Sequence, residues 1–472
     1  ESGTAMTGPG NTARTASRAE IALALFGEPK RFTAFIGALL LLTLQFQTLP
    51  VDINVQLLPL TTALALLFLP FIVRDIPRSP ILTVIGLFTG YAVLHSTLAL
   101  GVDLMANPGD IRFYAWFRQL IALLAGVVTY LVLRSGLLAV EDRDVIRFMI
   151  LGAIPSLLLA GLNIIWGTLG LGWAGEIVTS VRSVISPEGY TSPMRATGFA
   201  TEPAALATSL VTAMFPIFLF ELGTRRPSMG MFFILILSLL AFSWTFSLTG
   251  VLLLLGVLIS GVFLGPSRKL LAIMVASFIV LSIAGIMLIP GNQIMRHLSV
   301  LGAGGENISF TDRYYSAFGP FISIFTSWSS LGYGLGGIAT HFTDVIPPDV
   351  AREIIWAKQE GLPSLTSIFG RVFAETGIIG WMLFLSMFVV AFRSVAALLK
   401  AEPSPEKRRL YACFRIGLVA VVFSLFFSIG PYHTPYLWLW IALIDSRYII
   451  HLRNTRHGTL PDAVPRDPDL SA

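Results

Sequence analysis

Apolar residues along this chain gather into long runs that short polar segments separate. A straight helix needs about 20 such residues to cross a bilayer, so the runs predict membrane-spanning helices, although several are shorter than that. The predicted spans are residues 33–50, 55–73, 80–100, 116–134, 146–166, 203–222, 229–245, 247–264, 270–290, 366–392, 410–430 and 432–449. The pattern predicts an all-α polytopic membrane protein with about twelve transmembrane helices.

Lysine and arginine residues collect in alternate loops between these spans. Short cytoplasmic loops of membrane proteins are enriched in Lys and Arg, so this distribution orients the chain. The basic residues on the predicted cytoplasmic side include Arg74, Arg78, Arg134, Arg143, Arg147, Arg225, Arg226, Arg268, Lys269, Arg393, Arg409, Arg447, Arg453 and Arg456. We therefore expect both termini in the cytoplasm.

Two longer segments interrupt the short loops on the outer side, at residues 167–202 and 290–365. Loops of this length in compact proteins are usually functional or disordered. The second is too rich in aromatic and apolar residues for disorder. Within it, the pattern predicts a helix at the membrane interface over residues 312–328 and a more polar helix over 349–360.

The predicted domain organisation has three parts. Residues 1–30 form a cytoplasmic N-terminal tail, residues 31–450 a single transmembrane domain, and residues 451–472 a cytoplasmic C-terminal tail. Both tails are poor in apolar residues, so we expect them to be disordered.

Composition narrows the class of protein further. Charged residues make up 12% of the 472 residues and hydrophobic residues 55%, which excludes a soluble multidomain protein. The net charge of +5 reflects cytoplasmic Lys and Arg near headgroups, so it does not indicate nucleic-acid binding. The single cysteine, Cys413, excludes an intramolecular disulfide and a multi-cysteine metal site.

Arginines at the outer loops break the charge rule that the other loops follow. They are Arg182, Arg195, Arg296, Arg313, Arg352 and Arg371. An arginine on the side that should be poor in basic residues needs another reason to be there, and binding a phosphate group is the usual one. This distribution predicts an outward-facing site for a pyrophosphate-linked substrate.

Four of the outer charged residues have two interpretations each. Arg195 is either a headgroup anchor or a ligand-binding residue, and its place just outside a span favours binding. Glu202, directly before a proline, is on its own more simply a helix-start residue. Arg371 and Glu375 lie one helical turn apart and could pair locally. They also lie at the outer end of a span, where ionisable groups tend to face a cavity.

The region after Asp312, a helix-start residue, contains a glycine-rich run and a histidine. The run Leu331–Gly337 resembles a phosphate-binding loop only loosely, because no strand precedes it, and an ordinary turn is the simpler interpretation. His341 follows it and could act as a base near neutral pH, although a lone loop histidine is more often a surface residue. The sequence has no HExxH or CxxC motif, so we predict no metal and no cofactor.

Three stretches together resemble a known family. Arg195-Ala-Thr-Gly-Phe-Ala-Thr-Glu202-Pro resembles the R-x-x-G-[FL]-x-x-[ES]-P stretch of the O-antigen polymerase and O-antigen ligase superfamily. Arg313 followed by Leu331-Gly-Tyr-Gly-Leu-Gly resembles the family's outer-loop arginine and P-L-x-G-x-G-x-G turn. Ala-Glu375-Thr-Gly-Ile-Ile-Gly resembles its A-E-x-G-[LI]-[LI]-G. The order of the motifs and the twelve-span layout agree with the family over most of residues 30–450.

The resemblance implies glycosyl transfer on the periplasmic face of the bacterial inner membrane, from glycans linked to undecaprenyl pyrophosphate. By this resemblance Arg195, Arg313 and Arg371 hold and neutralise the leaving pyrophosphate without a metal. A base deprotonates the acceptor hydroxyl. The expected partners are the lipid-linked glycan and membrane lipids, and a chain-length regulator protein is a further candidate.

The sequence departs from the family at one informative place. Ligases commonly have His-Asn about nine residues before the Glu of A-E-x-G, where this chain has Thr366-Ser367. This favours a polymerase over a ligase that transfers finished glycan to lipid A–core. It leaves the base open among His341, Glu202, Glu375 and Asp312. A flippase or transporter of a phosphate-bearing lipid and a structural membrane subunit are the alternatives outside these enzymes.

Overall fold

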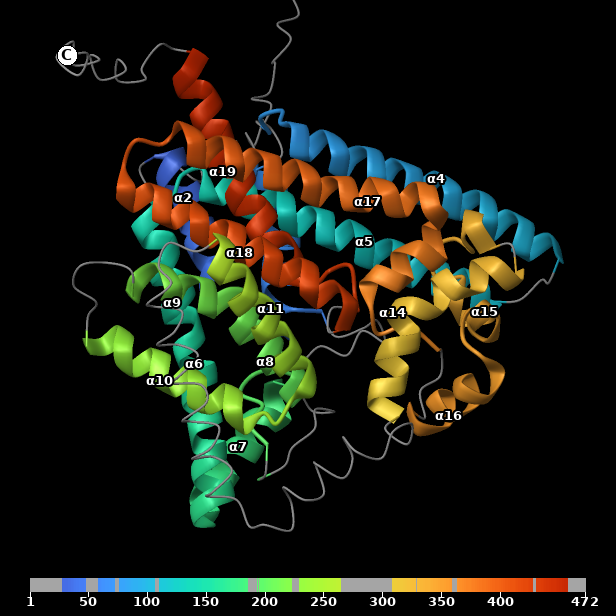
Figure 1. The fold of residues 1–472 in the computed structure, drawn as a ribbon, viewed down its shortest axis with the longest axis horizontal. Helices are drawn as coiled ribbons and strands as arrows, with labels where there is room; N and C mark the ends of the chain where they lie inside the picture. The colour runs from blue at the N-terminus through green and yellow to red at the C-terminus, as the bar shows by residue number, and fades with distance from the viewer. Residues whose placement is uncertain are drawn as a thin grey trace, which may run out of the picture.

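The computed structural model describes residues 28–47, 58–72, 76–106, 110–185, 193, 195–222, 229–264, 308–327, 329–358, 363–427 and 430–456. Every regular element in these ranges is a helix, as predicted (Figure 1). Within these ranges, six helices are long and apolar enough to cross a membrane, and three shorter apolar helices accompany them. The predicted span 270–290 lies outside the described residues, as do residues 1–27 and 457–472 of the predicted tails.

The helices of the transmembrane part follow the predicted spans, often with longer ends. They are α2 (Pro29–Leu42), α3 (Leu60–Ile72), α4 (Pro80–Ala106), α5 (Asp110–Leu137), α6 (Asp142–Leu169), α8 (Pro203–Ser209), the π-helical turn η2 (Leu210–Met214), α9 (Phe215–Leu222), α10 (Met229–Trp244), α11 (Leu248–Leu264), α17 (Ile368–Ala401), α18 (Pro405–Phe427) and α19 (Pro435–Arg456).

Four further helices belong to the predicted outer segments. They are α7 (Gly172–Ile185), α14 (Ile308–Ser327), α15 (Ile338–Val345) and α16 (Pro348–Lys358), with the short 3₁₀ turn η3 (Ser329–Leu331). Helices α14 and α16 confirm that residues 312–328 and 349–360 are largely helical. In Figure 1, α14, α15 and α16 lie together beside the N-terminal end of α17.

Helices α5 and α19 continue past residues 134 and 449, where we expected their spans to end. Arg134 lies inside α5 with its side chain fully buried against Asp445. Arg447 lies inside α19 and donates to Asp142 and to the carbonyls of Leu137 and Val140. Protein partners replace water around these guanidinium groups, so the helices need not end where the apolar run does. Accordingly, α19 continues to Arg456, past residue 450 where we expected the tail to begin.

The segment formed by α8, η2 and α9 lies at the centre of the bundle. Its most apolar window is 94% buried, more than that of the other long candidate spans. The indole of Trp440 in α19 donates to the carbonyl of Thr212 at 2.6 Å, in the π-helical turn. A π turn frees carbonyls from the α-helical ladder, and here another helix uses one of them.

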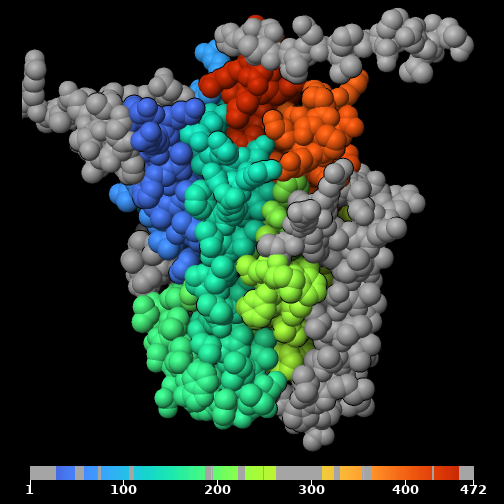
Figure 2. Space-filling model, turned by 90° about the vertical axis from the view of Figure 1, so that its left-hand side faces the viewer, coloured from blue at the N-terminus to red at the C-terminus, as the bar shows by residue number. Residues whose placement is uncertain are grey.

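Close helix contacts depend on small residues. A Cβ on Gly37 of α2 would lie 2.8 Å from the backbone of Gly136 in α5, and one on Gly152 of α6 would lie 2.4 Å from the carbonyl of Leu42. Small residues allow helix backbones to approach closely in membranes. Figure 2 shows α2 lying along the neighbouring helices α5 and α6.

Candidate functional site

The first part of the site is the segment Thr245–Thr249, which joins α10 to the first turn of α11. We call it the arginine turn. Arg195 donates from Nε to the carbonyl of Thr245 at 2.9 Å and from Nη2 to that of Phe246 at 3.4 Å. Arg313, at the start of α14, donates from Nη1 to the hydroxyl of Thr249. Two of the predicted arginines, 118 residues apart in the chain, therefore bond to the same short turn.

Glu202 completes this part of the site. It occupies the N-cap position of α8 with Pro203 at the first helical position, but its side chain makes no capping hydrogen bond. Its Oε1 instead lies 3.5 Å from Nη2 of Arg313. The Glu202 side chain is 53% exposed and that of Arg313 is 18% exposed. The structure thus gives Glu202 a polar contact beyond the helix-start role that the sequence favoured.

The backbone around the arginine turn is held in strained and tightly bonded conformations. Phe246 has φ of 47°, which costs a non-glycine residue roughly 1–3 kcal/mol. Gly198, with φ of 52°, leaves no room for a Cβ beside Ser156. Arg182 of α7 is buried and donates to the carbonyls of Gly198, Ala200 and Thr201. Although burial lowers the pKa of Arg182, these carbonyls replace its hydration and fix the loop that leads to Glu202.

The second part of the site is a loop, Leu331–Gly337, which we call the glycine clasp. Gly377 breaks the helical geometry of α17 with φ of 66° and ψ of −170°. The carbonyls of Ala374 and Glu375 accept from the amides of Tyr333 and Gly334, both at 2.8 Å. The amide of Gly336 donates to Oε1 of Glu375 at 3.1 Å. These clasp amides are therefore bonded to α17 and are not presented to a phosphate group.

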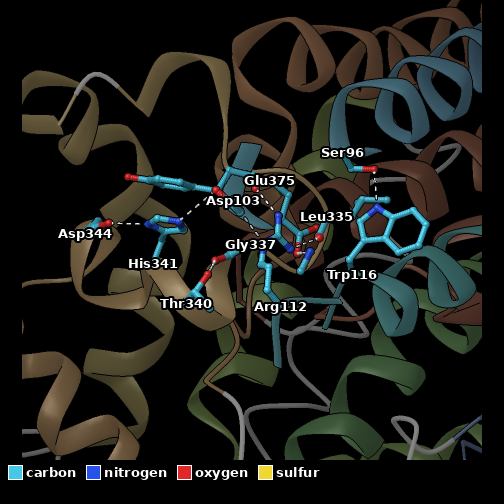
Figure 3. A network of polar contacts seen from close by, with 12 residues as sticks. Ser96, Asp103, Arg112, Trp116, Leu335, Gly337, Thr340, His341, Asp344 and Glu375 are labelled. Atoms are coloured by element: carbon cyan, nitrogen blue, oxygen red, sulfur yellow. Dashed lines mark hydrogen bonds and ion pairs between the residues drawn. The ribbon is translucent and has the colours of Figure 1, made fainter. Parts of the chain in front are cut away.

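Arg112 of α5 holds the opposite side of the clasp. Its Nη1 and Nη2 donate to the carbonyls of Leu335 at 2.9 Å and Tyr333 at 2.7 Å. Its Nε donates to Asp103 of α4 at 2.7 Å (Figure 3). Gly332, Gly334 and Gly336 all have positive φ, and a Cβ on any of them would collide with α4, α5 or α17. Glycine is required here because these backbones approach so closely.

Glu375 lies inside the protein with both carboxylate oxygens bonded. It is 2% exposed, and Oε2 accepts from the hydroxyl of Tyr432 at 2.8 Å. Arg371 is equally buried and donates from Nη2 to the carbonyl of Leu365. Arg371 and Glu375 interact through their charges, without a hydrogen bond between them among the described residues. Their side chains are therefore less exposed than those of Arg313 and Glu202.

His341 connects the outer helices to α4. Its Nδ1 lies 2.8 Å from Oδ2 of Asp344 and its Nε2 3.9 Å from Oδ1 of Asp103 (Figure 3). Its ring stacks on Tyr333 with centroids 4.4 Å apart. Asp103 thus lies between His341 and Arg112. Through its stacking on Tyr333, the predicted histidine also contacts the glycine clasp.

Asp312 lies next to Arg313 but points into the protein. It is 5% exposed, and its Oδ1 accepts from the hydroxyl of Ser316 at 3.2 Å. The same hydroxyl accepts from the amide of Thr366, just before α17. Asp312 therefore helps to join α14 to α17.

The structure brings the sequence-predicted residues together in two groups. Arg195, Arg313 and Glu202 gather at the arginine turn, whereas Glu375 and His341 contact the clasp. Sequence reasoning missed Arg112 and Asp103, although the proximity of opposite charges across the gap between two apolar runs was a visible signal. Arg296 lies outside the described residues.

In the described ranges, no group of three or more His, Cys, Asp and Glu side chains is placed to hold a metal ion. A cavity of about 860 Å³ lies among the 138–143 and 401–407 turns and the end of α19. It is on the predicted cytoplasmic side, and Arg143 and Arg447 in its wall are paired with Glu406 and Asp142. None of the residues that line it belongs to the arginine turn or the glycine clasp.

Comparison of the chain with protein-family models gave no match, and comparison with curated proteins gave none either.

Proposed function

We propose that this chain polymerises undecaprenyl-pyrophosphate-linked oligosaccharide repeat units into O-antigen or a related exopolysaccharide. The proposal includes a twelve-span arrangement in the bacterial inner membrane, with both termini cytoplasmic and the site facing the periplasm. Its basis is the ordered resemblance of three motifs, the basic cytoplasmic loops and the geometry of the arginine turn.

The observation that carries the proposal is the convergence of Arg195 and Arg313 on one turn. Each arginine is held by hydrogen bonds to the turn, and Arg313 remains partly exposed. Guanidinium groups fixed in this way are suited to a diphosphate, because they need no reorganisation as negative charge develops on the leaving group. The strained Phe246 accepts a hydrogen bond from Arg195, and strain of this kind concentrates at functional sites.

The reaction is a single displacement at a sugar. The hydroxyl oxygen of the acceptor glycan attacks the anomeric carbon of the donor glycan, and a new glycosidic bond forms. The bond from that carbon to the phosphate oxygen breaks, and undecaprenyl pyrophosphate leaves with the electron pair. Arg195 and Arg313 stabilise the departing charge, and no metal is required.

Glu202 is the group that we assign as the base. It lies 3.5 Å from Nη2 of Arg313, and its side chain is 53% exposed. Glu375 has both oxygens bonded inside the protein, and Asp312 is buried against Ser316. His341 is held at the clasp by Asp344. Proton transfer to a positioned carboxylate contributes about 10²–10⁴-fold to a rate.

Arg371 takes a different role from the other two motif arginines. It is buried and faces a cavity with room for one water-sized particle, so we assign it to positioning Glu375 and the start of α17. The diphosphate then depends on Arg195 and Arg313.

A reconstitution tests the proposal. The full chain is placed in lipid with an undecaprenyl-pyrophosphate-linked repeat unit as the sole substrate, and the glycans are separated by electrophoresis. A ladder without lipid A–core supports a polymerase. Transfer only after lipid A–core is added would identify a ligase, and movement of the lipid across the bilayer without new glycosidic bonds would identify a flippase.

A further inference from the structure

A small cavity lies behind the glycine clasp, between α5 and the start of α17. Its wall includes Arg118 and Gln119 of α5, Gly336 of the clasp, and Arg371 and Glu375 of α17. About 10 Å³ of it is open to the centre of a water-sized sphere. That space holds one particle the size of a water molecule.

Three residues that line this cavity each carry a buried side-chain atom with no hydrogen-bond partner within the described residues. These atoms are Nε of Arg118, Oε1 of Gln119 and Nη1 of Arg371. Gln119 and Arg371 are 3% and 2% exposed, so water outside the protein does not reach these atoms freely. Buried polar atoms are nearly always bonded, and convergence of three on one cavity points to a bound species.

The charges around the cavity are unbalanced. Arg118 and Arg371 are close enough to repel each other, and Glu375 is the carboxylate in the same wall. Arg112 does not add to the excess, because Asp103 pairs with it at 2.7 Å. Within the described residues, no ion pair engages Arg118. Two guanidinium groups against one carboxylate leave one positive charge in a poorly hydrated place, which favours an anion over a neutral molecule.

We propose that this cavity binds a small monovalent anion, of the size of chloride, between Arg118, Arg371 and Gln119. The two guanidinium groups donate to it, and rotation of the Gln119 amide presents its NH₂ group as a third donor. A halide is only slightly larger than water, whereas a phosphate group is far larger than the space. The anion site is thus distinct from the arginine turn and does not depend on the proposed function.

The anion has a structural consequence for the clasp. Its negative charge reduces the repulsion between Arg118 of α5 and Arg371 of α17. The hydrogen bond from Gly336 of the clasp to Glu375 lies beside the same cavity. A ligand that binds only the folded protein raises its stability in proportion to the logarithm of ligand concentration. Chloride should therefore stabilise the folded chain.

The test compares melting temperatures of the full-length protein in sodium chloride and sodium gluconate at equal ionic strength. We expect chloride to raise the Tm of the wild type by roughly 2–4 °C. Gln119→Glu places a carboxylate beside the two arginines and should remove the chloride effect, and Arg118→Met should do the same. Arg143→Met, at an exposed pair with Glu406, should retain it.

A diffraction measurement keeps the test decisive if a variant fails to fold. Crystals of the wild type soaked in sodium bromide should give an anomalous peak between Arg118 and Arg371. The proposal is overturned if the cavity gives no bromide peak, because a water molecule would then satisfy the three atoms. It is equally overturned if Gln119→Glu keeps the full chloride dependence. Neither readout involves polymerisation, so failure here is distinguishable from failure of the proposed function.

Discussion

Arginine is used in two opposite ways at the glycine clasp and at the arginine turn. Arg112 is buried, and its guanidinium group donates hydrogen bonds to Asp103 and to two carbonyls of the clasp. Arg313 bonds to Thr249 but remains partly exposed beside a mostly exposed Glu202. The polar groups of the clasp are bonded within the protein and hold the structure, whereas the turn leaves Arg313 and Glu202 partly exposed.

This contrast changes how the motifs are interpreted. The glycine-rich loop resembled a phosphate-binding loop only loosely, with an ordinary turn as the simpler interpretation, and the amides of Tyr333, Gly334 and Gly336 are bonded to α17. The glycines are needed because the loop packs directly on helix backbones. Substitutions in the two regions should therefore separate stability from activity.

The largest effect is expected at the clasp from Gly336→Ala. The new Cβ would lie 2.4 Å from the carbonyl of Ala115, at a residue with φ of 71°. Strain and overpacking together should cost about 3 kcal/mol or more of folding free energy, seen as a loss of monodisperse folded protein in detergent. Gly90→Ala, with open space around its Cβ, is the matched control and should fold normally. Normal folding of both variants would show that the clasp is not tightly packed.

The next largest effect is expected at the turn from Arg313→Ala or Arg195→Ala. Removing a fixed donor to the leaving diphosphate should lower the polymerisation rate about 10²–10³-fold while the amount of folded protein is unchanged. Arg→Lys at either position should rescue poorly, because a point charge cannot give bidentate contacts. Full-length glycan chains from either alanine variant would contradict the diphosphate role.

Glu202→Gln and His341→Gln separate the candidates for the base. The first should lower the rate about 100-fold at unchanged melting temperature, because the proton acceptor is lost. The second should mainly lower the melting temperature, because it removes the imidazole that contacts Asp344 and stacks on Tyr333. Steady-state rates per folded molecule provide the comparison, and the reverse pattern would assign the base to His341.

Arg112→Lys should lower stability by about 2 kcal/mol, because lysine cannot replace both carbonyl contacts and the contact to Asp103. Thermal unfolding measures the change, and the rate per folded molecule should be retained. Arg147→Lys, at a surface pair, is the control and should change neither quantity. A loss of rate without a loss of stability would move Arg112 into the ligand-binding group.

The smallest effect is expected from Cys413→Ala. The thiol is 2% exposed among apolar side chains in α18, far along the chain from either region. A cost of about 1 kcal/mol or less in thermal unfolding and an unchanged polymerisation rate are expected. A marked loss of activity would imply a role for this thiol that its apolar surroundings do not suggest.

The helices were predictable because apolar runs are a local property of the sequence. The ends of the helices were less predictable. Arg134 and Arg447 lie within helices because residues from distant segments pair with them. The break in α17 at Gly377 was not predicted, because its cause is the approach of Leu331, 46 residues earlier in the chain. Patterns of hydrophobicity do not contain such contacts.

The candidate site was predictable only residue by residue. The arginines on the side expected to be poor in basic residues included Arg195 and Arg313, whose side chains both bond to one turn. The same signal could not distinguish them from Arg182, which binds backbone carbonyls instead. Arg112 was missed because its clasp partners are more than 200 residues away in the sequence.

The most direct test of the arginine turn is reconstitution of the wild type and Arg313→Lys in lipid with an undecaprenyl-pyrophosphate-linked repeat unit as sole substrate. We expect a glycan ladder from the wild type, and none or only traces from the variant at the same melting temperature. A ladder of equal length and rate from both proteins would contradict a role for Arg313 at the diphosphate. The absence of any ladder from folded wild-type protein would contradict the polymerase itself.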